Sequence, residues 1–551
     1  MKKFLLLTAA AAVMLTGCDK NPEGSSPSKV GDSKVGYLSV RLTNSNSAQK
    51  DTKASGTNDG SAEESNVGSL MALLFNNGIC IDVVEVSGGT IGNSSTTGTA
   101  SDAVLVNASA THAVVVANPE KAAWSDLKID FSAADLTTEK TKVVGKSWVA
   151  LNQLVNLAVT GVATNNFFTM ANAGSEDTGA LIPVTVVTAD NGKTDEQAKT
   201  EAKQKAAKIN IDRLSSKVTF EINDNLTVLP TGSKFTFGGW ELNITNKSSY
   251  LYSELVKLTD PNATGEYRCD GNYDTKKFPS IEKAPADRTP TEITALSTAL
   301  RKEFNVLLNS DDSSVPTSPV TRAKSASAYC LENTMEAAAQ KKGVTTSIVI
   351  KAEYTPKDID ATGEKSYFIW NHQYYTLGQL KAAYAVAAAA DHTAGIAKDL
   401  PNFLRAAKIT GVDAATTDVL MDSFVANLTA ASFNAESGII GRYMAVQYFH
   451  NSVCYYEVLV RHDQGITTKM ALGRYGVVRN NWYTVNLRSV SGPGTPWIPD
   501  PTDPVDPTDP DKPIDPTTPT DPGTNDDSDN SYLSVTITVR PWTTWSYEVD
   551  I

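Results

Sequence analysis

The sequence is poor in the residue types on which most enzymes and metal sites depend. It has only five histidines and five cysteines among 551 residues. The histidines form no HExxH motif and the cysteines form no paired Cys-x-x-Cys motif, so we expect no metal site. The nucleophile motif GxSxG and the phosphate-binding motif GxxxxGK[S/T] are also missing. We therefore expect a protein that is not an enzyme and needs no cofactor.

Clusters of basic residues are missing too. Aspartate and glutamate outnumber lysine and arginine by 62 to 49, which gives a net charge of −13. Binding to a nucleic acid requires a basic surface, because phosphates dominate the affinity. No Lys/Arg-rich block supplies one here, so we exclude nucleic acid as a partner.

The first 18 residues, MKKFLLLTAAAAVMLTGC, have the composition of an export signal. Two lysines precede an apolar run that is too short to span a bilayer as a mature helix. The run ends in LTGC, residues 15–18, which resembles the bacterial lipobox. The resemblance implies that Cys18 is acylated and becomes the amino terminus of an exported lipoprotein precursor. An ordinary signal peptide with a chance cysteine is the alternative.

The remaining cysteines are too few to hold together a chain of this length. Their number is even, which permits one disulfide in an exported protein and requires none. We expect buried thiols or a single pair among Cys80, Cys269, Cys330 and Cys454.

Most of the chain has the pattern of a mainly β protein. Short β-branched runs separated by Gly, Asn, Ser and Thr predict two antiparallel β-sandwich domains, over residues 54–215 and 216–490. Residues 19–53 contain a polar tether followed by one strand. Surface helices are expected over residues 194–208, 289–304 and 378–398, where Ala, Leu and Lys dominate.

Residues 491–530 form an Asp/Pro-rich segment with almost no apolar content. Proline favours the polyproline II conformation, and the neighbouring acidic groups repel one another. At about 3.1 Å per residue, this extended spacer reaches on the order of 100 Å. It can therefore carry residues 531–551 onto another molecule.

One strand is written twice in this chain. YLSVRLT spans residues 37–43 and YLSVTIT spans residues 532–538. In the first copy Leu38, Val40 and Leu42 alternate with polar residues, as in a half-buried strand. The second copy opens a longer strand that we expect to bend at Pro541. Its apolar residues share one parity: Leu533, Val535, Ile537, Val539, Trp545, Tyr547, Val549 and Ile551.

Two such strands cannot occupy one groove, so the second copy can enter only where the first has left. The polar stretch after the first copy is the kind of exposed loop that proteases cut, and Lys50 and Lys53 are the candidate sites. Cleavage would open the groove for the carboxyl-terminal strand of another subunit. Head-to-tail exchange of this kind builds a filament, a homopolymer of the chain. The alternatives are chance similarity of two strands, or packing of the last strand beside the first within one chain.

Several longer stretches have a specific pattern: YYEVLVRH from Tyr455, GRYGVVRNNWYTVNLRSV from Gly473, the Pro-rich spacer and the SYEVDI ending. These stretches resemble the fimbrillins, which build type V pili of the Bacteroides group, and in particular the shaft subunits of minor, Mfa-type fimbriae. Weaker matches include INIDRLSSKV from Ile209 and AYCLENT from Ala328.

The resemblance implies two transthyretin-like β-sandwiches and a palmitoylated precursor carried to the outer membrane before it enters a cell-surface fimbria. It also implies trimming by a trypsin-like surface protease, donor-strand exchange, and anchor and tip fimbrial subunits as partners. Adhesion to host or bacterial receptors and biofilm formation would follow. Family members are cut after an Arg, whereas here Lys53 holds the matching place. The alternative function is a lipid-anchored glycan-binding protein or tip adhesin that does not polymerise.

Overall fold

The computed structural model shows a mainly β protein, which confirms the predicted fold class. Helices and many short connections surround the sheets, and most strand pairs are antiparallel. The structure describes residues 34–44, 58–59, 64, 66–89, 91–92, 98–119, 129–154, 163–164, 167–173, 179–190, 192–263, 266–283, 287–308, 320–440, 445–498 and 533–543.

The amino-terminal part is built on an eight-stranded sheet. Its strands follow the order β5-β4-β8-β11-β13-β2-β6, and β12 pairs with β8. Their bounds are Ile79–Glu85 (β5), Leu70–Asn76 (β4), His112–Ala117 (β8), Met170–Asn172 (β11), Ala207–Arg213 (β13), Val40–Asn44 (β2), Ile91–Gly92 (β6) and Ile182–Pro183 (β12).

Both faces of this sheet are covered. On one face the hairpin-like pair β1 (Val35–Leu38) and β7 (Val104–Asn107) closes an apolar core that includes Leu38 and Val115. On the other face, α1 (Leu136–Lys140) and α2 (Trp148–Leu154) lie over a second core that includes Leu151. Two short strands, β9 (Ala163–Thr164) and β10 (Phe167–Phe168), form a separate pair.

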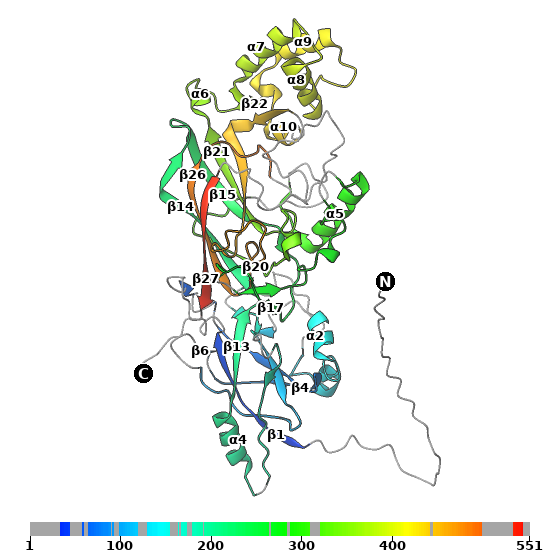
Figure 1. Ribbon diagram of the computed structural model, residues 1–551, viewed down its shortest axis with the longest axis vertical. Coiled ribbons are helices and arrows are strands. Elements are labelled where there is room, and N and C mark those ends of the chain that lie inside the picture. Colours follow the sequence, from blue (N-terminus) through cyan, green and yellow to red (C-terminus); the bar gives the residue numbers. More distant parts are fainter. Residues whose placement is uncertain are drawn as a thin grey trace, which may run out of the picture.

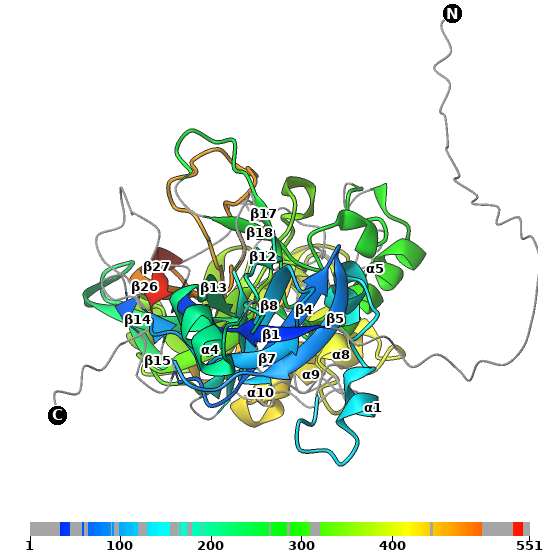
Figure 2. The same ribbon diagram turned by 90° about the horizontal axis from the view of Figure 1, so that it is seen from below.

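Helix α4 (Asp195–Gln204) forms within the predicted segment and begins at a capping box between Thr194 and Gln197. One side of this surface helix is buried. Ala198 and Ala202 are buried and pack with Tyr37 of β1. The view along the molecule shows α4 next to β1 (Figure 2).

The carboxyl-terminal part is a sandwich of two sheets around one core. The five-stranded sheet has the order β20-β14-β26-β27-β3, and the three-stranded sheet has the order β15-β21-β25. Phe220, Trp240 and Tyr483 lie between them. The strands are β20 (Ser327–Leu331), β14 (Ser215–Val228), β26 (Asn481–Val490), β27 (Leu533–Thr543), β3 (Asn58–Asp59), β15 (Lys234–Asn243), β21 (Ser347–Thr355) and β25 (Val453–Leu459).

Residues 367–377 and 444–449 lie within the second predicted sandwich, but the strands that they form do not join it. They make a separate sheet of β23 (Gln373–Tyr375), β22 (Tyr367–Trp370) and β24 (Val446–Phe449). Four helices pack around it through a core that includes Phe368 and Phe403. They are α7 (Leu377–Ala388), α8 (Gly395–Ala406), α9 (Asp418–Asn427) and α10 (Ala435–Ile440).

The remaining elements are short, apart from α5 (Pro290–Glu303), which forms as predicted and is capped by Thr289 and Glu292. Two strand pairs flank the middle of the molecule, β16 (Thr245–Asn246) with β19 (Phe304–Asn305) and β17 (Glu254–Val256) with β18 (Tyr267–Cys269). The other helices are α6 (Lys357–Asp360) and the 3-10 turns Thr275–Lys277, Ala337–Ala339, Ala430–Ser432 and His450–Ser452.

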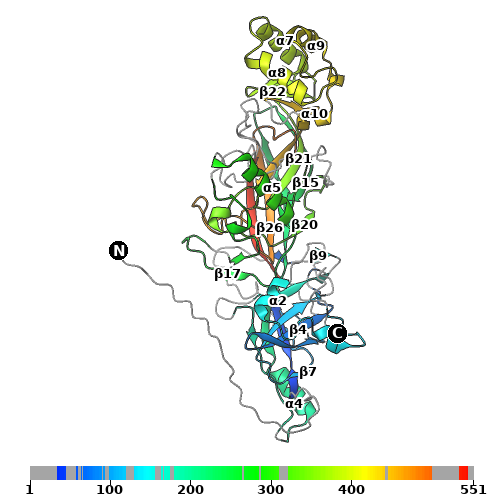
Figure 3. The same cartoon turned by 90° about the vertical axis from the view of Figure 1, so that its right-hand side faces the viewer.

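The molecule is long and narrow (Figures 1 and 3). Helices α7, α8 and α9 lie at one end, and β1 and α4 lie at the other. The amino-terminal sheet and the carboxyl-terminal sandwich are joined directly by the main chain. Strand β13 of the first ends at Arg213, and strand β14 of the second begins at Ser215. Across the described ranges, none of the helices has the length and apolar character needed to cross a bilayer.

The sheets are mixed, although antiparallel sheets were predicted. Strand β2 runs parallel to both β13 and β6, and β14 runs parallel to β26. Parallel neighbours need a crossover connection, so these pairs join segments that are far apart in the sequence. The first strand is placed by such parallel pairings, whereas the carboxyl-terminal strand β27 lies antiparallel to β26.

Candidate functional site

The first copy of the repeated strand is held between neighbours on both sides. It is divided at Ser39 into β1 and β2. β1 pairs with β7 on one side, and Tyr37 forms a bridge with Val187 on the other. β2 lies between β13 and a second edge made by Ser101 and β6. We call this two-sided seat of residues 35–44 the strand slot.

The strand in the slot is buried on both faces, not on one as the alternation predicted. Leu38 and Val40 are each 1% exposed and Leu42 is 6% exposed, and all three belong to the core under the sheet. Tyr37 points to the opposite side, where α4 covers it at 9% exposure. The three apolar side chains alone contribute about 5–9 kcal/mol as an upper estimate.

A pair of serines fixes the strand at the point where β1 becomes β2. Ser39 is 1% exposed, and its Oγ donates a hydrogen bond to the main-chain oxygen of Ser101 at 2.8 Å. The Val40 amide donates to Ser101 Oγ at 3.0 Å, and the Ser101 amide donates to the Val40 oxygen at 2.8 Å. On the other side, the Ala207 amide donates to the Ser39 oxygen at 3.1 Å. No motif or pattern in the sequence indicates that Ser101 takes part.

The second copy is not in the slot. It lies on the other sheet as β27, antiparallel to β26, with Leu533 opposite Val490 and Val539 opposite Tyr483 (Figure 1). Its remaining contact with a strand is short, because β3 pairs in parallel only with Trp542 and Thr543. β27 is thus nearly an edge strand, and Ser534 in it is exposed.

The predicted bend at Pro541 does not end this strand. Pro541 lies opposite Asn481, and β27 continues to Thr543. A proline is tolerated at such a position because an edge strand has one side on which no amide is needed. The other predicted donor residues, Trp545, Tyr547, Val549 and Ile551, lie outside the described residues, as do Cys18, Lys50 and Lys53.

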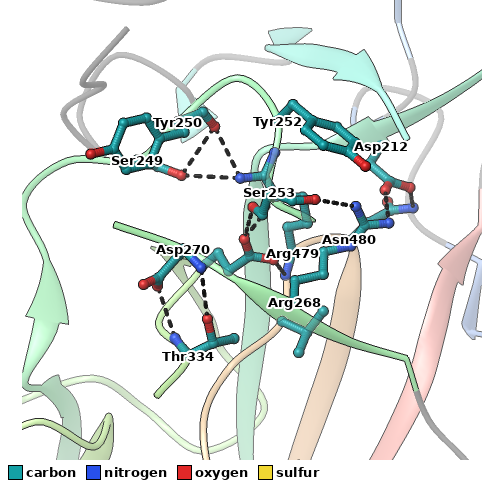
Figure 4. A network of polar contacts seen from close by, with 12 residues as sticks. Asp212, Ser249, Tyr250, Tyr252, Ser253, Arg268, Asp270, Thr334, Arg479 and Asn480 are labelled. Carbon is teal, nitrogen blue, oxygen red and sulfur yellow. Dashed lines mark hydrogen bonds and ion pairs between the residues drawn. The ribbon is translucent and has the colours of Figure 1, made fainter. Parts of the chain in front are cut away.

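A buried polar network joins the slot to the second sheet (Figure 4). Asp212 belongs to β13, the strand that forms one wall of the slot, and its carboxylate oxygens accept from Arg268 Nη2 at 2.8 Å and Asn480 Nδ2 at 3.0 Å. Asn480 Oδ1 in turn accepts from Arg213 Nη1 at 2.9 Å. Arg268 and Asp212 are each 3% exposed, so their charges are paired away from water. The wall of the slot is therefore fixed to the neighbouring domain.

The network continues to Glu64, which lies between β3 and β4 in the sequence. Glu64 is 4% exposed and accepts from Lys217 Nζ at 2.9 Å and from the Tyr329 hydroxyl at 2.5 Å. Its main-chain oxygen accepts from Arg213 Nε at 2.9 Å. Burial lowers the pKa of Arg213 to about 10, which leaves the guanidinium charged at neutral pH. Glu64 thus ties the chain down eleven residues after Lys53.

At the far end of this network, two further buried acidic residues also form internal hydrogen bonds. Glu332 accepts from Arg479 Nε at 3.2 Å, and Arg479 Nη1 donates to the Leu251 oxygen at 2.8 Å. Burial and the nearby charge of Glu332 raise the pKa of Asp270 to about 7. Both oxygens of Asp270 accept backbone amides, from Asn272 and Thr334. These groups form hydrogen bonds within the protein, which is typical of a structural network.

Within the described residues, no group of three His, Cys, Asp or Glu side chains could hold a metal ion. All four cysteines predicted to be buried or singly paired are free thiols. Cys80, Cys330 and Cys454 are buried, and burial raises the pKa of Cys330 to about 12.

Residues 447–548 match the family model described as Major fimbrial subunit protein type IV, Fimbrillin, C-terminal. The match contains β25, β26 and β27, so it includes both the carboxyl-terminal strand and the strand on which it lies. It confirms the resemblance to fimbrillins over these residues, and the matched family consists of structural subunits, not enzymes. No curated protein sequence matches the chain.

Solved structures share a distant likeness with nearly the whole chain. A candidate cell adhesion protein from Parabacteroides distasonis ATCC 8503 is 12% identical with a TM-score of 0.40, over 92% of this chain and 99% of that chain. A fimbrilin (FimA) from Porphyromonas gingivalis W83 is 14% identical with a TM-score of 0.34, over 93% and 98%. The tip fimbrial protein Mfa3 from Porphyromonas gingivalis, truncated at its carboxyl terminus, is 11% identical with a TM-score of 0.34, over 92% and 100%.

Proposed function

We propose that this protein is a structural subunit of a cell-surface fimbria and that it polymerises by donor-strand exchange. In this proposal a protease removes residues 35–44 with the rest of the leader, and the carboxyl-terminal strand of another subunit fills the strand slot. The observation that carries the proposal is the different seating of the two related strands. One is enclosed in a slot, and its copy lies at an edge.

The direction of exchange follows from the hydrogen bonds that each seat offers. A strand in the slot has a neighbour on both sides and buries Leu38, Val40 and Leu42. A strand on β26 has one full ladder and a two-residue contact with β3. Main-chain hydrogen bonds and apolar burial both favour the enclosed seat, so an empty slot should draw β27 away from its edge.

Cleavage is needed because the slot is full in the precursor. Lys53 lies between the slot strand and Glu64 in the sequence. Glu64 is held in place by hydrogen bonds from Lys217 and Arg213. A cut after Lys53 or Lys50 separates the first strand from this anchor. The leader can then leave with the acylated Cys18 while the rest of the subunit remains intact.

The finer role is that of a shaft subunit. A shaft subunit needs both a strand that can be removed and a strand that can be donated, and this chain has both. Anchor and tip subunits, a trypsin-like surface protease and surface receptors are then the expected partners. The precursor would be an outer-membrane lipoprotein, and the mature protein would support adhesion and biofilm formation.

The test is amino-terminal sequencing of the protein sheared from native cells, together with assembly of the purified precursor after limited trypsin digestion. We expect a start at Ala54 or Asp51 and filaments visible by electron microscopy. The variant lacking Ser531 to Ile551 should be trimmed but stay monomeric. A double variant, Lys50→Gln with Lys53→Gln, should resist both trimming and assembly. An acylated Cys18 on all the native protein would overturn the proposal and favour an anchored binding protein.

A further inference from the structure

The proposed exchange leaves open where along the slot the incoming strand comes to rest. Apolar alternation decides which face is buried but not the register. A shift of two residues would put Val535, Ile537 and Val539 where Leu38, Val40 and Leu42 now lie. All of these side chains are aliphatic, so the apolar core beneath the slot accommodates both registers about equally well. The register must be set by other contacts.

We propose that Ser101 and the pocket under α4 select one register, in which Ser534 takes the place of Ser39 and Tyr532 takes the place of Tyr37. This inference rests on the proposed function and names the residues that recognise the partner strand. The two copies agree at five of seven positions, and the agreement includes both of these residues. The remaining positions pair Arg41 with Thr536 and Leu42 with Ile537.

The serine contact supports this register because a buried hydroxyl must have a partner. Ser39 is 1% exposed and satisfies Ser101, whose Oγ lies 3.3 Å from Ser39 Oγ and accepts the Val40 amide. Ser534 supplies the same hydroxyl. In the register shifted by two residues, Thr536 would stand there with an additional methyl group in a fully buried position.

The tyrosine pocket supports the same register independently. Tyr37 packs with Val187, Ala198 and Ala202, and Lys199 Nζ lies 5.5 Å from the centre of its ring. Tyr532 fills this space in the proposed register. In the shifted register Ser534 would fall in the pocket, and the space left by the missing ring would remain empty.

The space around Gly36, at the start of the slot strand, limits where the matched segment can begin. A Cβ atom at Gly36 would lie 2.6 Å from Val186 Cγ1 and 3.0 Å from the Val187 oxygen. The copy has Ser531 at this position. The incoming chain therefore matches the slot from Tyr532 onward and must diverge from the path of Gly36 before it. The slot thus recognises the segment that begins where the Asp/Pro-rich spacer ends.

A cysteine pair measures this register directly. In the full chain, Ser101→Cys is combined with Ser534→Cys, and the protein is trimmed, allowed to assemble and oxidised with copper phenanthroline. The 3.3 Å separation of the two native oxygens places the sulfurs within disulfide reach after small side-chain movements. We expect a ladder of covalent multimers on non-reducing gels. The matched control, Ser101→Cys with Thr536→Cys, should give monomers, as should the unaltered chain.

The outcomes distinguish the register from the exchange itself. Filaments that give a ladder with Thr536→Cys and not with Ser534→Cys would overturn the inference and leave donor-strand exchange standing. A failure of the unaltered, trimmed chain to form filaments would overturn the proposed function.

A second measurement leaves the slot unaltered and changes only the ligand. Synthetic peptides of residues 531–551 are bound to trimmed protein that lacks Ser531 to Ile551. We expect Ser534→Ala to weaken binding about tenfold, since one buried hydrogen bond is lost. Thr536→Ala should change it less than threefold, because the first copy has Arg41 there. Equal losses for the two peptides would contradict the proposed register.

Discussion

Individual buried charges hold the wall of the slot in place. Asp212 is paired with Arg268 at 2.8 Å, and both are 3% exposed. Removing one partner from such a pair leaves an uncompensated charge in the interior. We expect Asp212→Ala to lower the free energy of unfolding by about 3–5 kcal/mol, measured by urea denaturation at neutral pH. A loss below 1 kcal/mol would show that water reaches the pair.

The matched control is Asp102→Ala. Asp102 forms an ion pair with Lys203 of α4 at 2.8 Å, but its side chain is 62% exposed. Exposed pairs contribute little, because solvent screens them. This variant should unfold at nearly the same denaturant concentration as the unaltered chain.

Leu38 offers a test of whether the first strand matters only before trimming. It is 1% exposed in the core of the slot. Leu38→Ala should destabilise the precursor by about 2–5 kcal/mol through a buried cavity. After trimming, the variant and the unaltered protein should assemble into filaments of equal thermal stability, because the strand has gone. Val35→Ala, at a residue that is 55% exposed, is the control and should leave the precursor unchanged.

At the scale of elements, α9 is joined to the end of α7 by a contact that depends on pH. Asp422 of α9 accepts from the Tyr384 hydroxyl at 2.9 Å and lies 3.0 Å from His392 Nε2. The hydrogen bond to Asp422 raises the pKa of His392, and the hydrogen bond from His392 lowers the pKa of Asp422. Asp391 and Asp418 add to the negative field around the imidazole.

The directions of the two pKa shifts determine how the stability depends on pH. The raised pKa of His392 gives stability that is complete below about pH 6.5 and is lost as pH rises through the raised pKa. The lowered pKa of Asp422 gives stability that is lost only as pH falls below about 4. His392→Ala should therefore lower Tm near pH 5.5 and have no effect near pH 9, measured by calorimetry. An equal loss at both pH values would contradict the ion pair.

The sequence predicts elements well where their pattern is periodic. The segments that become β14, β15, β21, β25 and β26 alternate or are β-branched, and α5 carries its capping residues. Strand β4 lacks such a pattern, because its first six residues, LMALLF, are all apolar and all buried. Such a run contains no period of two. His392 was placed in a helix and lies in the turn before α8.

Tertiary context explains the other differences. The strands β22, β23 and β24 have ordinary strand patterns. No local sequence feature indicates that they pack against helices and not within the sandwich. The repeat predicted the importance of Leu38, Val40 and Leu42. It gave no indication of Ser101, Glu64 or Asp212, because these residues lie 56 or more positions away in the sequence from the groups that they bind.

For the whole molecule, the state with an empty slot is the informative one. Removal of residues 35–44 uncovers the apolar floor lined by Val106, Val115 and Ile209. Trimmed protein that lacks Ser531 to Ile551 should bind the dye ANS strongly and should lose this binding when a peptide of residues 531–551 is added. The untrimmed chain is the control and should bind little dye. Dye binding that the peptide does not reduce would mean that the exposed surface lies elsewhere.

The short link between the two parts has a mechanical consequence. Only Leu214 separates β13, which forms one wall of the slot, from β14, an inner strand of the second sheet. Tension applied along the molecule would pass from a strand in the slot to β13 by shear across parallel main-chain hydrogen bonds, which break together and not one at a time. It would then enter β14 through covalent bonds. A thread of such units would carry load along its backbone, with no hinge to extend first.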